Sequence, residues 1–114
     1  MRHVMNLHPQ PFSMIASGEK TIELRLLDEK RQLISVGDTI VFKNSQNPEM
    51  TLSCIVRALH VFSSFEELYK ALPLDKCGYT QEELSSAKAE DMDVYYPPEK
   101  QEKWGVVGIE IELI

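Results

Sequence analysis

Apolar and polar residues alternate along several segments of the chain, which is the pattern of β-strands with one buried face. The segments are 20–26, 39–43 and 106–113, and residues 2–7 are predicted to form a further short strand. Apolar residues fall on both faces of 51–62, as expected of a strand that bends through a small barrel. The alternation predicts one core that contains Ile22, Leu24, Ile40, Phe42, Ile109 and Ile111.

Helix signals occur in three places between these strands. A helix is expected over 9–17, because proline is tolerated in a first turn and Gly18 is of the type found just after a helix end. Ser64 begins a capping box that is followed by apolar residues at helical spacing. Thr80 begins a second capping box, which predicts a polar helix to about Glu90.

The order of these elements predicts an α+β fold formed by a single domain over residues 1–114. We expect a small mixed β-barrel of five to six strands, with one helix after the first strand and helical segments before the last. A chain of 114 residues is long enough to bury one hydrophobic core without disulfides.

Several classes of protein are disfavoured by the absence of their signals. No stretch approaches the roughly 20 apolar residues of a membrane span, and the first residues lack the apolar run of a signal peptide. We therefore expect a cytoplasmic protein that has no membrane partner. Cys54 and Cys77 have no metal-ligand spacing, and the three histidines are dispersed, so neither a metal nor a cofactor is expected. The oligomeric state is left open.

The formal net charge of −6 is unevenly distributed. Residues 1–43 hold six Lys/Arg and five Asp/Glu, whereas residues 44–114 hold six and thirteen. A protein that coats duplex DNA neutralises many phosphates, so this balance argues against such a role. The first part of the chain is the expected contact for an anionic ligand, and the acidic second part favours a short or small one.

The segment 18–25 carries the most suggestive chemistry. On an alternating strand Thr21, Glu23 and Arg25 share one face, and this face is either an exposed surface or the wall of a polar cleft. Lys20 can direct a donor into such a cleft. A guanidinium held by Glu23 can bind a phosphate or a base edge with two hydrogen bonds, and a carboxylate can accept from an exocyclic amine. The alternative is a surface ion pair of little energetic value.

A second group of residues is a candidate for the opposite wall of the cleft. Tyr95 and Tyr96 lie in a proline-bounded loop, and Trp104 lies beside a glycine, where an aromatic ring can stack on a base. Lys100 lies between them and adds a positive charge. The alternative for the aromatic residues is that they pack against the protein.

Taken together, these motifs resemble the ASCH domain (activating signal cointegrator homology), a relative of the PUA domain. The resemblance covers residues 5–113 and implies a PUA-like barrel of five or six strands with a cleft associated with RNA or nucleotide binding. The motif residues are Gly18, Lys20, Glu23 and Arg25 after a short helix, Gly37 and Asp38 before a strand, and the closing run from Gly105 to Ile109, together with the run from Leu7 to Phe12.

Some small bacterial members of that family are amidohydrolases that deacetylate acetylcytidine with a Lys, a Thr and a Glu. The resemblance places their Lys at Lys20, whereas their Thr falls on Glu23, with Thr21 one step earlier on the strand. No Glu occupies the matching position near Cys77. Lys20, Thr21 and Glu23 are therefore the catalytic candidates if the protein is an enzyme.

Three functions are compatible with the sequence. The first is a module that binds RNA or a modified nucleotide through Lys20, Glu23 and Arg25. The second is a hydrolase that acts on a modified nucleoside or on RNA. The third is a module that only recruits another protein.

Overall fold

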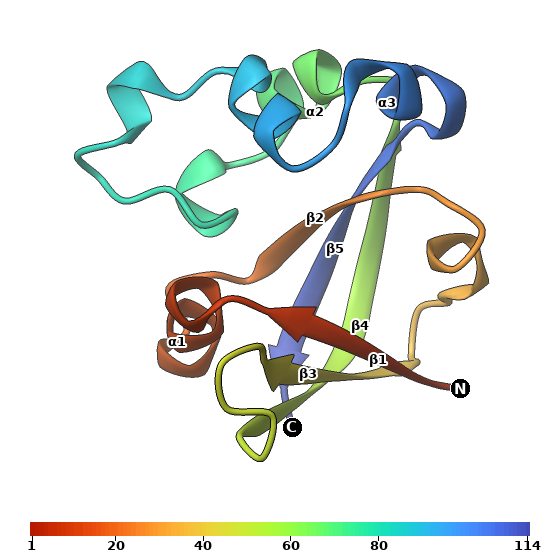
Figure 1. Ribbon diagram of the computed structural model, residues 1–114, viewed down its shortest axis with the longest axis vertical. Helices are drawn as coiled ribbons and strands as arrows, with labels where there is room; N and C mark the ends of the chain where they lie inside the picture. Colours follow the sequence, from red (N-terminus) through yellow and green to blue (C-terminus); the bar gives the residue numbers. More distant parts are fainter.

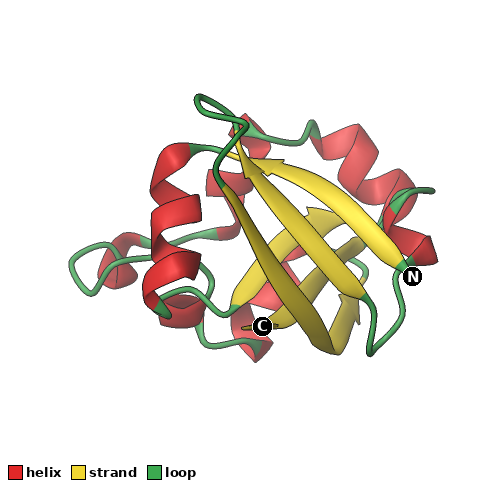
Figure 2. Ribbon diagram, turned by 90° about the horizontal axis from the view of Figure 1, so that it is seen from below, coloured by secondary structure: helices red, strands yellow, loops and turns green.

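The computed structural model describes residues 1–114 as a five-stranded mixed sheet that is curled into a half-barrel and flanked by short helices (Figure 1; Figure 2). The predicted α+β class is confirmed, and the curled sheet is consistent with a small PUA-like barrel. The strands are β1 Arg2–Leu7, β2 Ile22–Leu26, β3 Thr39–Asn44, β4 Thr51–Phe62 and β5 Val106–Leu113.

The sheet has the order β1-β3-β4-β5-β2, so β1 and β2 are its two edges. β1 is parallel to β3, and all other neighbours are antiparallel. The register of β4 against β5 shifts between Val56 and Ala58. Such an irregularity increases local twist and bends a long strand, which allows β4 to pass through the whole half-barrel.

Each face of the sheet contributes to a separate hydrophobic cluster, whereas the alternation predicted a single core. Ile40, Phe42, Ile109 and Ile111 lie in the cluster between the curled sheet and the first helix. Ile22 and Leu24, also buried, belong to a second cluster on the other face. The reason is that helices cover the apolar face of β2 from outside the half-barrel, so β2 is buried on both faces.

The helices are α1 Pro9–Ser17, α2 Phe65–Ala71 and α3 Pro98–Trp104. Gly18 ends α1 with a φ of 84°, a left-handed conformation that glycine adopts without strain. The hydroxyl of Ser64 accepts a hydrogen bond from the backbone N–H of Glu67 and caps α2, as predicted. None of the helices is long and apolar enough to cross a lipid bilayer.

The predicted helix from Thr80 to Glu90 is wrong. Only half of its capping box forms, since the Glu83 side chain accepts from the backbone N–H of Thr80 at 2.8 Å. The chain then makes two 3-10 segments, Leu84–Ser86 and Ala89–Val94. Short helices depend on packing of an apolar face, and this polar segment offers too few apolar residues for it.

A substitution at Gly108 in β5 tests how tightly the second cluster is packed. A Cβ at this position would lie 2.6 Å from Cδ1 of Leu72 and 3.2 Å from Cγ2 of Ile22. We expect Gly108→Ala to lower the free energy of unfolding by about 1–3 kcal/mol, measured by urea denaturation. Because the closest atom ends a flexible side chain, Leu72→Ala should relieve much of this cost in a double-mutant cycle. Equal costs in both backgrounds would contradict the proposed steric cause.

Candidate functional site

A cavity of about 730 Å³ separates the start of the chain from the segment between α2 and α3. In Figure 1 this segment lies across from α1 and β2. One wall comes from β1, α1 and β2, and the other comes from residues 69–96. The polar residues of the lining are Asn6, His8, Gln10, Lys20, Glu23, Arg25, Tyr69, Cys77, Tyr79, Glu83, Asp91, Tyr95 and Tyr96.

The first wall is built around a buried group of three charges, here called the Lys20–Glu23–Arg25 triad. Nζ of Lys20 lies 2.7 Å from Oε1 of Glu23, and Nε of Arg25 donates to Oε2 of Glu23 at 2.8 Å. The three side chains are only 9%, 5% and 14% exposed. The triad is therefore not the surface ion pair that the sequence left as an alternative.

Local structure explains why these side chains meet. After Gly18, the backbone N–H of Lys20 donates to the carbonyl of Met14 at 3.0 Å, which folds the chain back against α1. β2 then begins, and its register places Glu23 and Arg25 opposite Ile109 and Val107. Opposed residues share a face of a sheet. The charged face of β2 therefore points into the half-barrel.

Burial alone would raise the pKa of Glu23, but the neighbouring charges of Lys20 and Arg25 outweigh it and hold its pKa below the usual range. Burial likewise acts to lower the pKa of Arg25, and the Glu23 carboxylate more than compensates and raises it. Glu23 therefore stays ionised, and its carboxylate is a weak base.

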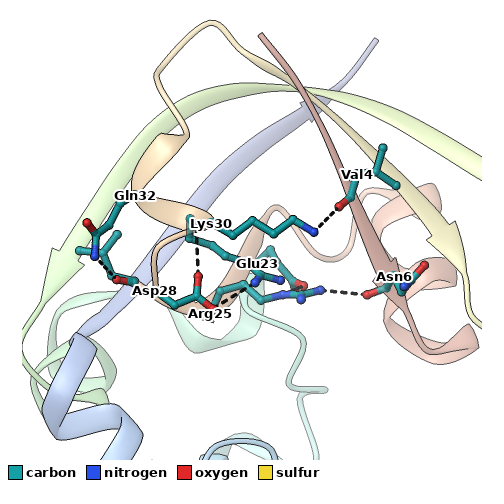
Figure 3. Close-up of polar contacts among 9 residues, drawn as sticks. Val4, Asn6, Glu23, Arg25, Asp28, Lys30 and Gln32 are labelled. Carbon is teal, nitrogen blue, oxygen red and sulfur yellow. Dashed lines mark hydrogen bonds and ion pairs between the residues drawn. The ribbon is translucent and has the colours of Figure 1, made fainter.

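Arg25 also bridges the open edge of the half-barrel. Its Nη2 donates to the backbone carbonyl of Asn6 at 2.9 Å, and Lys30 donates from Nζ to the carbonyl of Val4 at 3.3 Å (Figure 3). Because β1 and β2 are not paired through their backbones, these side chains supply donors to carbonyls of the β1 edge. The triad is therefore tied to both edges of the sheet.

The second wall carries a chain of hydroxyl groups. The hydroxyls of Tyr69 and Tyr79 are 2.7 Å apart, and Tyr79 donates to Oδ2 of Asp91 at 2.9 Å. Burial raises the pKa of Tyr69 to about 12, so this hydroxyl keeps its proton. Sequence analysis did not identify these three residues. Tyr69 belongs to the apolar stripe of α2, so its spacing predicts only packing. Nothing in the sequence links Tyr79 to Asp91.

The predicted aromatic loop contributes in part to this wall. Tyr95 and Tyr96 line the cavity, with Tyr95 64% exposed and Tyr96 stacked on Phe65 at a centroid distance of 6.1 Å. Lys100 and Trp104 do not line it, contrary to the predicted arrangement. The reason is that α3 directs Trp104 onto the second hydrophobic cluster and leaves Lys100 exposed.

Of the catalytic candidates, Lys20 and Glu23 line the cavity and Thr21 does not. Thr21 precedes β2 and borders a separate hollow of about 180 Å³. Cys77, at the position where the family resemblance expects a Glu, is buried, and burial raises its pKa to about 11, so it is a protonated thiol. No group of three or more His, Cys, Asp or Glu side chains is arranged to hold a metal ion.

Glu23→Gln tests the energetic role of the triad. The substitution leaves Lys20 and Arg25 buried without a counter-charge, so we expect a loss of about 3–5 kcal/mol in unfolding free energy. Glu112→Gln is the matched control, because Glu112 pairs with Arg57 at 2.6 Å on the surface and its loss should cost less than about 1 kcal/mol. Similar losses in the two variants, measured by chemical denaturation, would contradict the buried role.

The unfolding free energy lost in Glu23→Gln should depend on pH in one direction. The folded-state pKa of Glu23 is lowered, so its stabilisation is complete above the unfolded-state value of about 4.3. The stabilisation is lost as the pH falls through the lower folded-state pKa. The stability difference between wild type and Glu23→Gln should therefore narrow in acid, and a difference that widens there would contradict the assignment.

Comparison with known proteins supports a family relationship. The sequence matches the ASCH domain model over residues 5–114. The crystal structure of hypothetical protein PH0355 is similar over the full length of both chains, with 34% identity and a TM-score of 0.82. The NMR structure of protein PF0455 from Pyrococcus furiosus is also 34% identical, with a TM-score of 0.72 over 100% of this chain and 98% of that chain.

More distant structures share the fold alone. ASCH from Zymomonas mobilis is 14% identical, with a TM-score of 0.67 over 96% of this chain and 65% of that chain. No curated protein is detectably similar in sequence. The match to the family model spans nearly the whole chain and includes every residue of the triad. The chain therefore belongs to the ASCH domain family.

Proposed function

We propose that this ASCH protein binds one nucleoside unit, either free or as part of an RNA or a nucleotide, in the cavity between the two walls. The observation that carries the proposal is the burial of the Lys20–Glu23–Arg25 triad in the cavity wall. Moving a charged group out of water costs several kcal/mol, so buried charges that line a cavity are candidates for a functional role.

Lys20 distinguishes this role from a purely structural one. The bridge to Asn6 explains why Arg25 is buried, and Arg25 needs Glu23 as its counter-charge. Lys20 has no such structural task, because Glu23 is its only polar side-chain partner. An ammonium carries three N–H donors, so two of those of Lys20 are available to a ligand.

The size and lining of the cavity fit a nucleoside. A volume of about 730 Å³ lies in the range of sites for small molecules. Tyr95 at the rim presents an exposed ring, and aromatic rings of this kind stack on bases without a strong sequence preference. A base edge offers carbonyl and ring-nitrogen acceptors to the ammonium of Lys20.

The charges of the lining favour the uncharged part of a nucleotide. Lys20 and Arg25 face three carboxylates, those of Glu23, Glu83 and Asp91. A phosphate deep in the cavity would meet more negative than positive charge. We therefore place the base and ribose inside and any phosphate at the mouth.

The hydrolase alternative has weaker support. Glu23 is a poor general base because both of its oxygens are paired with cations. Thr21 lies outside the cavity, and a Thr nucleophile needs a base within hydrogen-bonding reach. We expect no turnover of acetylcytidine by chromatography after prolonged incubation. Efficient turnover that is lost in Lys20→Met would instead support the hydrolase.

Lys20→Met tests the binding proposal. Methionine keeps much of the side-chain volume and leaves Glu23 paired with Arg25, so we expect a folded protein. Nucleoside affinity, measured by calorimetry with a panel of nucleosides, should fall about 10-fold or more, because hydrogen bonds from charged groups contribute about 1.5–3 kcal/mol.

Lys76→Met is the matched control, since Lys76 is exposed, does not line the cavity and carries the same charge. It should bind as the wild type does. Equal weakening in both variants would indicate a general charge effect. Unchanged binding in Lys20→Met would remove the triad from the site.

A further inference from the structure

Asp91 is held in a fixed orientation in the second wall. It lies in the 3-10 segment Ala89–Val94, where its Oδ2 accepts from the hydroxyl of Tyr79 at 2.9 Å and from the backbone N–H of Lys88 at 3.2 Å. Tyr79 is itself in contact with the hydroxyl of Tyr69 at 2.7 Å. Both bonds to Asp91 go to the same oxygen, so the carboxylate cannot rotate without losing them.

The other carboxylate oxygen of Asp91 has no protein partner. Oδ1 accepts no hydrogen bond, and no Lys, Arg or His forms an ion pair with Asp91. This differs from Glu23, both of whose oxygens are paired. Of these two carboxylates, only that of Asp91 offers a free acceptor. The third carboxylate of the lining, Glu83, is exposed and is held at one oxygen by the backbone N–H of Thr80.

The two walls therefore offer complementary groups. Lys20 in the first wall and Asp91 in the second both line the cavity, the first as a donor and the second with an acceptor oxygen, Oδ1, that no protein group occupies. A ligand that satisfies both must carry an acceptor at one end and an N–H donor at the other. Bases with an exocyclic amine have this arrangement. Where a carbonyl replaces the amine, two acceptors would meet at that position, and the N–H donor of the base edge moves to the neighbouring ring nitrogen.

We propose that Asp91 determines ligand specificity by accepting a hydrogen bond from the exocyclic amine of a nucleobase. This assignment rests on the proposed function of the cavity. Tyr79 is a positioning residue, because it acts on the ligand only through the orientation of Asp91. A site built to accept a hydrogen bond from a ligand group discriminates against the analogue that lacks this group, because its acceptor is then left unpaired. Asp91 is half-buried, so this effect is reduced but not removed by solvent.

The test compares nucleosides that differ by one group. Cytidine and uridine, and adenosine and inosine, are pairs in which an amine is replaced by a carbonyl. Calorimetry with the wild type should show at least a roughly 10-fold preference for the amino member in the pair that binds. In Asp91→Asn this preference should disappear or reverse, because the amide can donate to the carbonyl through the group that replaces Oδ1.

Asp91→Asn preserves the local structure, since its remaining oxygen can still accept from Tyr79 and from Lys88. Asp93→Asn is the matched control, because Asp93 lies in the same 3-10 segment, is exposed and bonds Gln101 away from the cavity. It should keep the wild-type preference. Tyr79→Phe should reduce the preference in part, and it provides a second variant if Asp91→Asn unfolds.

The outcomes separate the two proposals. Binding with the same preference in wild type and Asp91→Asn, or a wild-type preference for uridine or inosine, would overturn the role of Asp91 and leave the binding function intact. Absence of binding of all four nucleosides to the wild type would overturn the proposed function and this assignment with it.

Discussion

The carboxylate of Glu23 is the group on which the rest of this structure depends. Its two oxygens are paired with cations at 2.7 and 2.8 Å, and it is one of the few charged residues that are almost completely buried. It pairs with Lys20, which lies between α1 and β2, and through Arg25 it is linked to the backbone of β1. Glu23 thus orients Arg25, whose side chain connects the two edges of the sheet, and it is itself part of the cavity wall.

This arrangement gives β2 two buried faces of opposite character. Its apolar face packs beneath α2, whereas its charged face points into the half-barrel beside Val107 and Ile109. The residues of the charged face retain polar partners, as buried polar groups require. β1 and β2 are therefore linked by side chains instead of a backbone ladder, which leaves the half-barrel open along this edge.

The fold class and the first wall were predictable from the sequence because both depend on local periodicity. Alternation along residues 20–26 placed Glu23 and Arg25 on one face, and Gly18 predicted the end of the preceding helix. The alternation could not show that both faces of this strand would be buried, because burial depends on which elements cover it. That is why one core was predicted where two clusters form.

The second wall was less predictable because non-local contacts determine it. Tyr79 and Asp91 are twelve positions apart in a segment without strand or helix periodicity, and only the fold brings them together. The predicted helix after Thr80 failed for a related reason: a capping signal is a local preference, and it has no effect unless an apolar face can be packed. The prediction that Trp104 lines the cavity failed for the same reason, since the surroundings of this side chain depend on the direction of α3.

The two walls of the cavity differ in local stability. The first is formed by strands of a continuous sheet and by the triad, whereas residues 77–96 form only turns and short 3-10 segments. Segments of this kind open locally at lower free energy than paired strands do. The hydrogen bonds that join Tyr69, Tyr79 and Asp91 compensate in part, because they link α2 to the weaker segment. The backbone N–H of Thr21, which donates to the carbonyl of Lys76 at 2.9 Å, connects the chain beside the first wall to the start of this segment. The ligand that we propose would add a further connection and would favour the ordered form of the second wall.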